Sequence, residues 1–320
     1  MIIFKQKTMV LLVIFLLIST IAHTAWVDNV PATLTQPDGT IVHAYRSGDE
    51  FHNWVHDIEQ FTIIQDAETG FWCWAISVDG ALVSTGHPVH LETATRLGIP
   101  ARANISEQKY QEKRKRFDIP SHLNNNSRTP TSGVVNNIVI FVKFADDDDF
   151  QTNLSYFDEI FNNSAENANS VYRYYWDASY NQLEVFSHFY PIPNGNTILS
   201  YTASHPRSYF QPYNAVTNPN GYMNDLQMVI REQTLIRDIV VAVSNQIPSD
   251  IIIDADGDGE VDNLNFVVRG DSGEWVDMLW PHAWTLYYFD VRINGSKVTN
   301  FNFNIENFIY RLGASVLAHE

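Results

Sequence analysis

Cysteine is almost absent from this chain: Cys73 is the only one among 320 residues. A single cysteine cannot form a disulfide within the chain, so the sequence is not that of a small domain stapled by disulfides. Zinc modules built from several thiolates are excluded too, and any bound metal must rely on histidines and carboxylates. Cys73 lies in the apolar run 71–76, where we expect it to pack in a strand.

Positive charge is also scarce. The chain has 20 Lys and Arg against 37 Asp and Glu, a formal net charge of −17. Such a surface repels phosphate backbones and anionic lipids on average, so we expect no nucleic-acid partner. With 45% hydrophobic and 13% aromatic residues the composition is that of a folded globular protein. Its length allows one large domain or two ordinary ones.

Long apolar runs are missing as well. The longest run, 9–21, follows Lys5 and Lys7 and precedes small residues up to Ala25, which is the pattern of an export signal. It is shorter than the roughly 20 apolar residues that a membrane-spanning helix needs. We therefore expect residues 1–25 to be a cleaved signal peptide, the mature protein to be secreted, and no stable membrane span to exist. The alternative is an uncleaved membrane anchor.

Two compositional blocks follow. Residues 26–116 contain strand-length apolar runs separated by turn signals at 36–39, 47–49, 68–70 and 78–80, which predict a small β-rich module. Residues 117–134 are rich in Asn, Ser, Thr and Pro and read as a linker. The basic run 113–116 precedes it, so we hypothesise that cleavage there or in the linker releases the β-rich module. The alternative is a solvated helix face.

The second block, 135–320, mixes both kinds of element. The buried-type runs 138–144 and 264–268 predict strands. Amphipathic spacing predicts helices over 154–161, 170–176, 225–246 and 309–319. The block is therefore expected to be an α/β (α+β) domain.

An acidic loop in this block has the spacing of a calcium site. Oxygen ligands are expected from positions one, three, five and nine of the loop and from the main-chain carbonyl at position seven. These positions hold Asp254, Asp256, Asp258, Asp262 and Glu260 respectively. Gly259 permits the sharp turn, but Asn265 replaces the usual twelfth-position Glu and a strand follows, so an EF-hand is not expected. We predict a structural Ca²⁺ site; the alternative is a solvated acidic turn.

Two other features are weaker. The run 146–149, Asp-Asp-Asp-Asp, follows the strand at 138–144 and could hold a second cation. Consecutive side chains point in different directions, which favours a solvated charge run. His282 lies between aromatic residues, and we expect a packed or hydrogen-bonded imidazole there.

The chain closes with His319 and Glu320 after the small and apolar run 312–318. A His-Glu pair at the end of such a run is how the active-site helix of a zinc peptidase begins. Without a second His one turn later, an ordinary helix surface is the alternative.

Taken in order, these segments resemble the immune-inhibitor-A peptidase family, which are secreted zinc metallopeptidases made as precursors. Residues 36–40, 48–51 and 70–72 resemble the family's pro-region, and 138–146 resembles the first strand of its catalytic domain. The resemblance continues through 170–183, where Asn181 replaces a common Gly in a turn and tolerates a left-handed backbone. Three further matches are the acidic loop 254–262, the Trp-Pro-His segment 279–282 and the final run 312–320.

The resemblance implies a zincin-like metallopeptidase domain, incomplete in this chain, preceded by a pro-module. It implies a zinc-dependent endopeptidase precursor acting on extracellular proteins or peptides, with His319 as a Zn²⁺ ligand and Glu320 as the general base for metal-bound water. The second His and a third ligand would lie beyond Glu320, so the chain as given is expected to be truncated and inactive alone. The alternative is a non-catalytic, calcium-stabilised secreted binding or surface protein.

Overall fold

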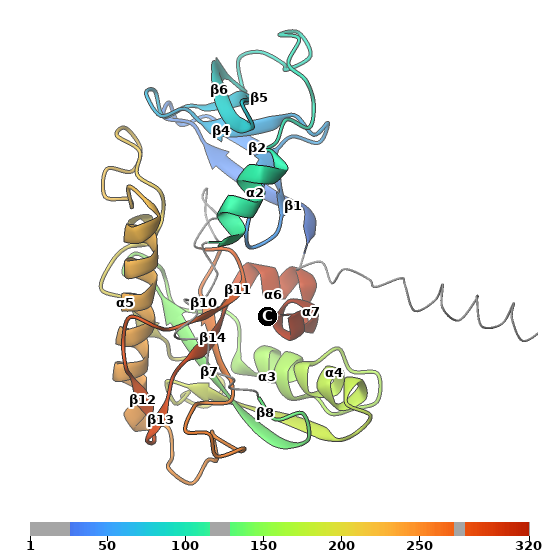
Figure 1. Cartoon of the computed structure of the whole chain (residues 1–320), viewed down its shortest axis with the longest axis vertical. Helices are drawn as coiled ribbons and strands as arrows, with labels where there is room; N and C mark the ends of the chain where they lie inside the picture. The colour runs from blue at the N-terminus through green and yellow to red at the C-terminus, as the bar shows by residue number, and fades with distance from the viewer. Residues whose placement is uncertain (1–25, 116–128, 272–278, 320) are drawn as a thin grey trace, which may run out of the picture.

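The computed structural model describes residues 26–115, 129–271 and 279–319. The predicted signal peptide, most of the predicted linker and Glu320 lie outside the described residues. Two separate sheets organise the rest (Figure 1). We call residues 26–115 the amino-terminal module and residues 129–319 the second module.

The amino-terminal module is a six-stranded antiparallel sheet whose strands follow one another in chain order. The strands are β1 (Val27–Thr35), β2 (Ile41–Gly48), β3 (Asn53–His56), β4 (Thr62–Gln65), β5 (Trp72–Val78) and β6 (Ala81–Pro88). The four turns predicted from sequence lie between strands β1 and β2, β2 and β3, β4 and β5, and β5 and β6. Cys73 is buried in β5, as predicted.

One helix closes this module. α2 (Glu107–Arg114) begins at Ser106, whose side chain accepts a hydrogen bond from the amide of Lys109 and so caps the helix. Lys113 and Arg114 belong to the last turn of α2.

The second module is built on a sheet in which β11-β14-β10-β7-β8 are neighbours in that order. Its strands are β7 (Gly133–Lys143), β8 (Leu183–Tyr190), β10 (Leu264–Val268), β11 (His282–Thr285) and β14 (Asn300–Ile305), and the short β9 (Tyr201–Thr202) pairs with β7. All these pairings are parallel except that of the edge strand β11 with β14. The strand predicted at 264–268 is confirmed, and β7 begins earlier than predicted.

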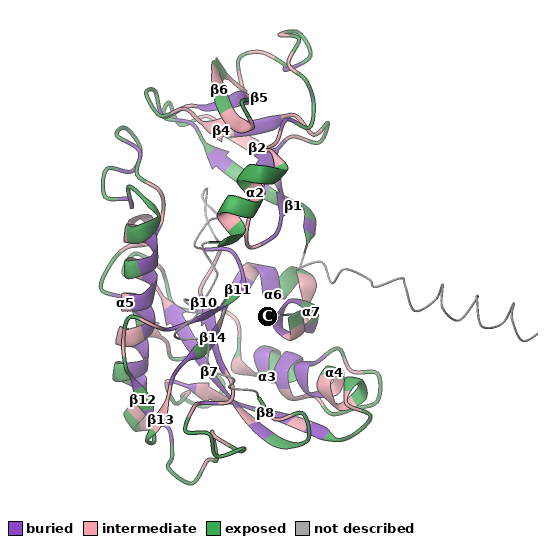
Figure 2. Ribbon diagram, viewed as in Figure 1, coloured by how far each residue is buried: buried purple, intermediate pink, exposed green. Residues whose placement is uncertain are grey.

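Helices cover both faces of this sheet (Figures 1 and 2). On one side lies α5 (Asp225–Val243), followed by the 3-10 turn η4 (Ser244–Gln246); on the other lie α3 (Leu154–Asn162), α4 (Val171–Ala178), α6 (Glu306–Leu312) and α7 (Ala314–His319). The remaining elements are the 3-10 turn η3 (Arg207–Phe210) and the hairpin of β12 (Arg292–Ile293) and β13 (Ser296–Lys297). The expected mixture of helices and strands is thus present.

The expected helix over 309–319 needs a correction. Gly313 interrupts it with φ of 61°, so α6 and α7 are two short helices that meet at an angle. The left-handed backbone predicted at Asn181 is confirmed, because this residue adopts φ of 65° in the turn between α4 and β8. Over the described residues, no helix combines the length and the apolar character that crossing a bilayer requires.

Candidate functional site

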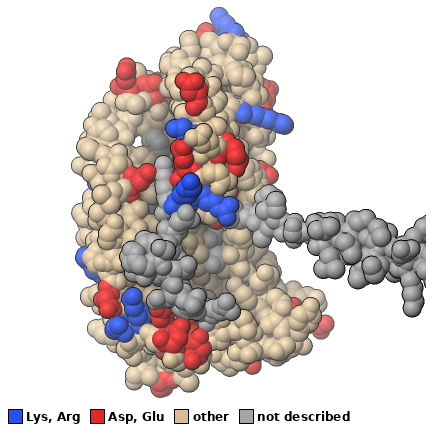
Figure 3. Space-filling model, in the orientation of Figure 1, with Lys and Arg blue, Asp and Glu red and all other residues tan. Residues whose placement is uncertain are grey.

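The acidic loop lies between η4 and β10, and its carboxylates converge. One carboxyl oxygen each from Asp254, Asp256 and Asp258 lies within 4.8 Å of the others. Gly257 and Gly259 have φ of 75° and 87°, so the chain can fold back tightly enough to bring alternate side chains inward. Figure 3 shows acidic side chains gathered at the end of the molecule where this orange loop lies in Figure 1.

One oxygen in the loop lacks a partner. Asp254 Oδ1 is buried and has no hydrogen-bond donor among the described residues, while its Oδ2 accepts from the amide of Gly259 at 3.0 Å. A buried carboxylate oxygen without a donor is unfavourable unless a cation faces it. Burial, with the charges of the three neighbouring aspartates, also raises the pKa of Asp262. These oxygens therefore fit a divalent cation.

Positions seven and twelve of the loop, Glu260 and Asn265, make hydrogen bonds outside the loop. The Glu260 side chain accepts from the hydroxyl of Thr299, the residue before β14, at 2.6 Å. The spacing assigns the main-chain carbonyl of Glu260 to the cation. Asn265 lies in β10 and accepts a hydrogen bond from Asn304 at 3.1 Å across the sheet, away from the loop. The Val261 amide donates to the Lys297 carbonyl, and the Lys297 amide donates to the Gly259 carbonyl. The loop is therefore tied to the β12–β13 hairpin that precedes β14.

His319 ends α7 beside an open cavity of about 720 Å³ between α4 and α7. α7 packs against α4, α6 and β14, and the Tyr175 hydroxyl donates to the main-chain carbonyl of Ala318 at 3.3 Å. Desolvation by the surrounding protein lowers the pKa of His319, which favours the neutral imidazole that binds metals. The predicted base Glu320 lies outside the described residues.

The zinc ligand set is incomplete. Within 26–115, 129–271 and 279–319, the only three or more metal-type side chains that meet are those of the acidic loop. His319 would therefore supply one ligand where a catalytic zinc site uses three. The described residues do not fit a catalytic zinc ion by themselves.

His282 is a packed residue, as predicted. Its ring stacks on Phe303 at 5.5 Å, its Nε2 lies 2.6 Å from a Glu232 carboxylate oxygen, and its Nδ1 lies 2.7 Å from the Trp280 carbonyl oxygen. Both His282 and Glu232 are buried. Both ring nitrogens of His282 therefore face oxygen atoms within hydrogen-bond distance.

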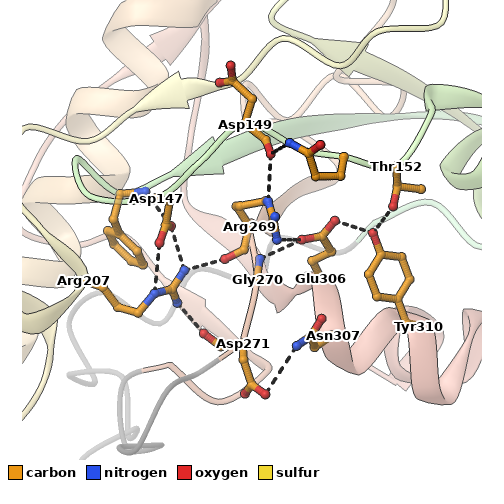
Figure 4. Close-up of polar contacts among 12 residues, drawn as sticks. Asp147, Asp149, Thr152, Arg207, Arg269, Gly270, Asp271, Glu306, Asn307 and Tyr310 are labelled. Atoms are coloured by element: carbon orange, nitrogen blue, oxygen red, sulfur yellow. Dashed lines mark hydrogen bonds and ion pairs between the residues drawn. The ribbon is translucent and has the colours of Figure 1, made fainter.

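The carboxyl edge of the second sheet carries a polar network that sequence reasoning missed (Figure 4). Arg207 pairs with Asp147 at 2.7 Å and donates to main-chain carbonyls of Arg269 and Asp271. Arg269 pairs with Glu306 at 2.8 Å. The network thus joins the loops that follow β7 and β10 to the first turn of α6.

The expected solvated charge run at 146–149 is confirmed for the exposed Asp146, Asp148 and Asp149, and this network corrects it for Asp147. Asp147 is not solvated: its side chain is 15% exposed and paired with Arg207. Asp146 accepts from the amide of Arg207, and Asp149 pairs with Lys143 at 2.6 Å, so no second cation site is formed by these side chains. Arg207 lies 60 residues away in the chain, and its partner could not be read from local spacing.

Neither a scan against family models nor a search of curated proteins found a match to this chain.

Proposed function

We propose that this protein is a secreted zinc-dependent endopeptidase precursor, in which the amino-terminal module is the pro-region and the second module is the first part of a zincin-like catalytic domain. The ordered motifs of the immune-inhibitor-A resemblance support the proposal. Export would be directed by the predicted signal peptide, and the substrates would be extracellular proteins or peptides.

The placement of His319 is the observation that carries this proposal. The chain passes from β14 through α6 into α7, which lies on the sheet and ends at His319 beside an open cavity. Arg173, Tyr174 and Asp177 of α4 line the other side of this cavity. A metal ligand at the mouth of such a space is accessible to a substrate.

The edge of the sheet supplies a second argument. β11 pairs with β14 on one side, and on its other side no strand of the described residues lies next to it. In an antiparallel pair, every second residue of an edge strand points its main-chain N–H and C=O away from the partner strand. In β11 these residues are Ala283 and Thr285. The Thr285 carbonyl already accepts a hydrogen bond from the Gln233 side-chain amide at 2.8 Å, whereas Ala283 is exposed. An extended peptide could pair there by strand addition.

Calcium is proposed as the structural cation of the second module. The partnerless oxygen of Asp254 and the converging carboxylates of Asp256 and Asp258 support it. Because the loop is hydrogen-bonded to β13, bound calcium would stabilise the hairpin that leads into β14, and through it the position of α6 and α7.

The coding sequence after Glu320 provides the first test of the zinc proposal. A continuation with His three codons later completes the family motif, whereas a stop codon contradicts the proposal. With such a continuation, the longer protein should bind one zinc ion per chain, measured by metal analysis after dialysis. His319→Ala should lose that zinc, and the exposed His43→Ala of the amino-terminal module should keep it.

The alternative is a calcium-stabilised secreted binding or surface protein without catalysis. One observation favours it: the described residues bring together the cation ligands of the acidic loop but only one zinc ligand. A stop codon after Glu320, together with a calcium-dependent rise in thermal stability, would support this alternative.

A further inference from the structure

The amino-terminal module meets the second module at two separate patches. In the first patch, the Arg46 guanidinium of β2 lies 3.4 Å from the Asp271 carboxylate, and the Arg46 side chain is only 2% exposed. Arg311, in the last turn of α6, donates to the Pro31 carbonyl of β1 at 3.2 Å. Both pairs border the same cavity, so they form one continuous polar contact between the modules.

The apolar part of the first patch comes from β1. Val27 and Val30 are 9% and 7% exposed, and they belong to the hydrophobic cluster that contains Phe303 and Phe308 of the second module. Among the described residues, the core of the amino-terminal module is a different cluster, around Leu34, and it does not include them. Separating the modules would therefore return apolar surface of β1 to water, which is unfavourable.

The second patch is formed by the turn between β4 and β5. Gly70 is buried although the three residues before it in the turn are exposed, and a Cβ at Gly70 would lie 2.9 Å from the Thr217 methyl group. Next to this contact, the Asn214 amide donates to the Asp66 carbonyl at 3.3 Å. The Thr217 hydroxyl donates to the Gln65 side chain at 3.2 Å. Glycine at position 70 thus permits a close approach of the two modules.

The two patches can act together because one sheet carries both. The first patch is on β1 and β2, and the second lies between β4 and β5 of the same six-stranded sheet. The loss of translational and rotational freedom on association is then met once for both patches, and their favourable contributions combine. None of these contacts involves the linker 117–134, so they do not require a covalent connection between the modules.

We propose that the amino-terminal module stays bound to the second module as a separate polypeptide after the chain is cut in the linker, held by these two patches. The hypothesised cleavage at 113–116 or in the linker would then produce a two-chain complex, and release of the module would require a further event. The proposal does not rest on the peptidase assignment, because it concerns only how the two modules hold together.

Cutting the folded full chain tests this. A recognition sequence for a site-specific protease is placed between residues 117 and 128, the folded protein is cut, and a denaturing gel verifies the cut. We expect both fragments to elute together in size-exclusion chromatography at micromolar concentration, at the volume of the uncut chain. Fragments that elute separately under these conditions would overturn the proposal.

One variant in each module tests the two patches. Gly70→Ala places a Cβ against Thr217 and should raise the Kd of the cut complex about tenfold, measured by the dilution at which the fragments separate. Asp271→Ala removes a partner of Arg46 and should raise the Kd by a smaller factor, about threefold, because this carboxylate is partly exposed. Because Asp271→Ala leaves the amino-terminal module unaltered, it keeps the test open if Gly70→Ala does not fold.

Matched controls separate loss of contact from loss of stability. Gly39→Ala also places alanine at a turn glycine of the amino-terminal module with positive φ, but open space surrounds that position. Asp290→Ala removes an exposed carboxylate of the second module. Both controls should keep the Kd of the unaltered complex. Kd values for Gly70→Ala and Asp271→Ala no higher than those of their controls would overturn the proposal.

Discussion

At the residue scale, the case for a calcium site depends on single carboxylate oxygens of Asp254, Asp256 and Asp258. Spacing alone identified the loop, because alternate acidic residues around a glycine are few in any sequence. The partnerless Oδ1 of Asp254 adds what spacing cannot, namely an atom whose burial calls for a cation. Asn265, at position twelve of the loop, was not predicted to be a ligand. Its side chain accepts a hydrogen bond from Asn304 within the sheet.

Asp256→Ala should remove most of the stabilisation by calcium. A cation held only by the folded state adds about 2.7 kcal/mol at one hundred times its Kd, so the melting temperature should rise with calcium in the unaltered protein. Asp256→Ala deletes an oxygen ligand but leaves the turn glycines in place. The matched control is Asp250→Ala, an exposed residue before the loop, which should keep the full rise. An equal rise in both variants would show that the loop is only a turn.

Acid should weaken the calcium effect earlier than it would for ordinary aspartates. Burial raises the pKa of Asp262, so protons begin to compete with calcium at a higher pH than the usual 3.8. Without calcium the effect of pH on stability has the opposite sign. Because the pKa of Asp262 is raised in the folded chain, the folded state loses stability as the pH rises through that pKa. The difference in melting temperature between calcium and chelator, followed from about pH 7 to about pH 4, should therefore shrink steadily. A difference that stays constant would contradict this.

Glu306→Ala tests the network at the sheet edge. Glu306 is 1% exposed and accepts from Arg269, from the amide of Gly270 and from the Tyr310 hydroxyl. Its removal leaves these donors unpaired, and we expect a loss of roughly 3 kcal/mol, near the low end for a broken buried pair because Arg269 is partly exposed. Denaturant unfolding measures it. Asp148→Ala, in the exposed part of the acidic run, should change stability by less than about 0.5 kcal/mol.

At the scale of elements, helices and strands with a regular hydrophobic pattern were predictable from the sequence, whereas an element that depends on tertiary contacts was not. The strand at 264–268 and the long helix α5 follow from apolar runs and helical spacing, and both are present. Strand β14 was not predicted, since it alternates Asn with Phe and Asn is uncommon in strands. Two of its side-chain amides donate to residues at or in β10: Asn302 donates to Asn263 and Asn304 donates to Asn265. Only the folded sheet brings these pairs together.

The break between α6 and α7 belongs to this scale too. Sequence predicted one helix because Gly inside an apolar helical run is tolerated. Gly313→Ala should destabilise the protein by about 1–3 kcal/mol, because the backbone there has positive φ and a Cβ would lie 2.8 Å from Asn169. Gly195→Ala has a similar φ but open space around it and should cost less. Equal losses in a thermal or denaturant titration would mean that the contact with Asn169 is unimportant.

For the whole molecule, composition and turn signals divided the chain into a β-rich part and a mixed part, and each part has its own sheet. The way they dock was beyond the sequence, since Arg46 and Asp271 are 225 residues apart. The same holds for the candidate active site: His319 was identified from the sequence, but its position beside α4 and the cavity depends on how α6 and α7 pack.

The central claim is that Glu320 belongs to a zinc endopeptidase, and hydrolysis by a longer chain tests it most directly. The protein continued through the second His and the remaining domain should cleave an unfolded protein substrate, and chelation should stop it. Glu320→Ala should reduce cleavage to background while zinc stays bound, because the Glu acts on water and does not hold the metal. Full activity of Glu320→Ala, or chelator-sensitive cleavage by the chain ending at Glu320, would contradict the account.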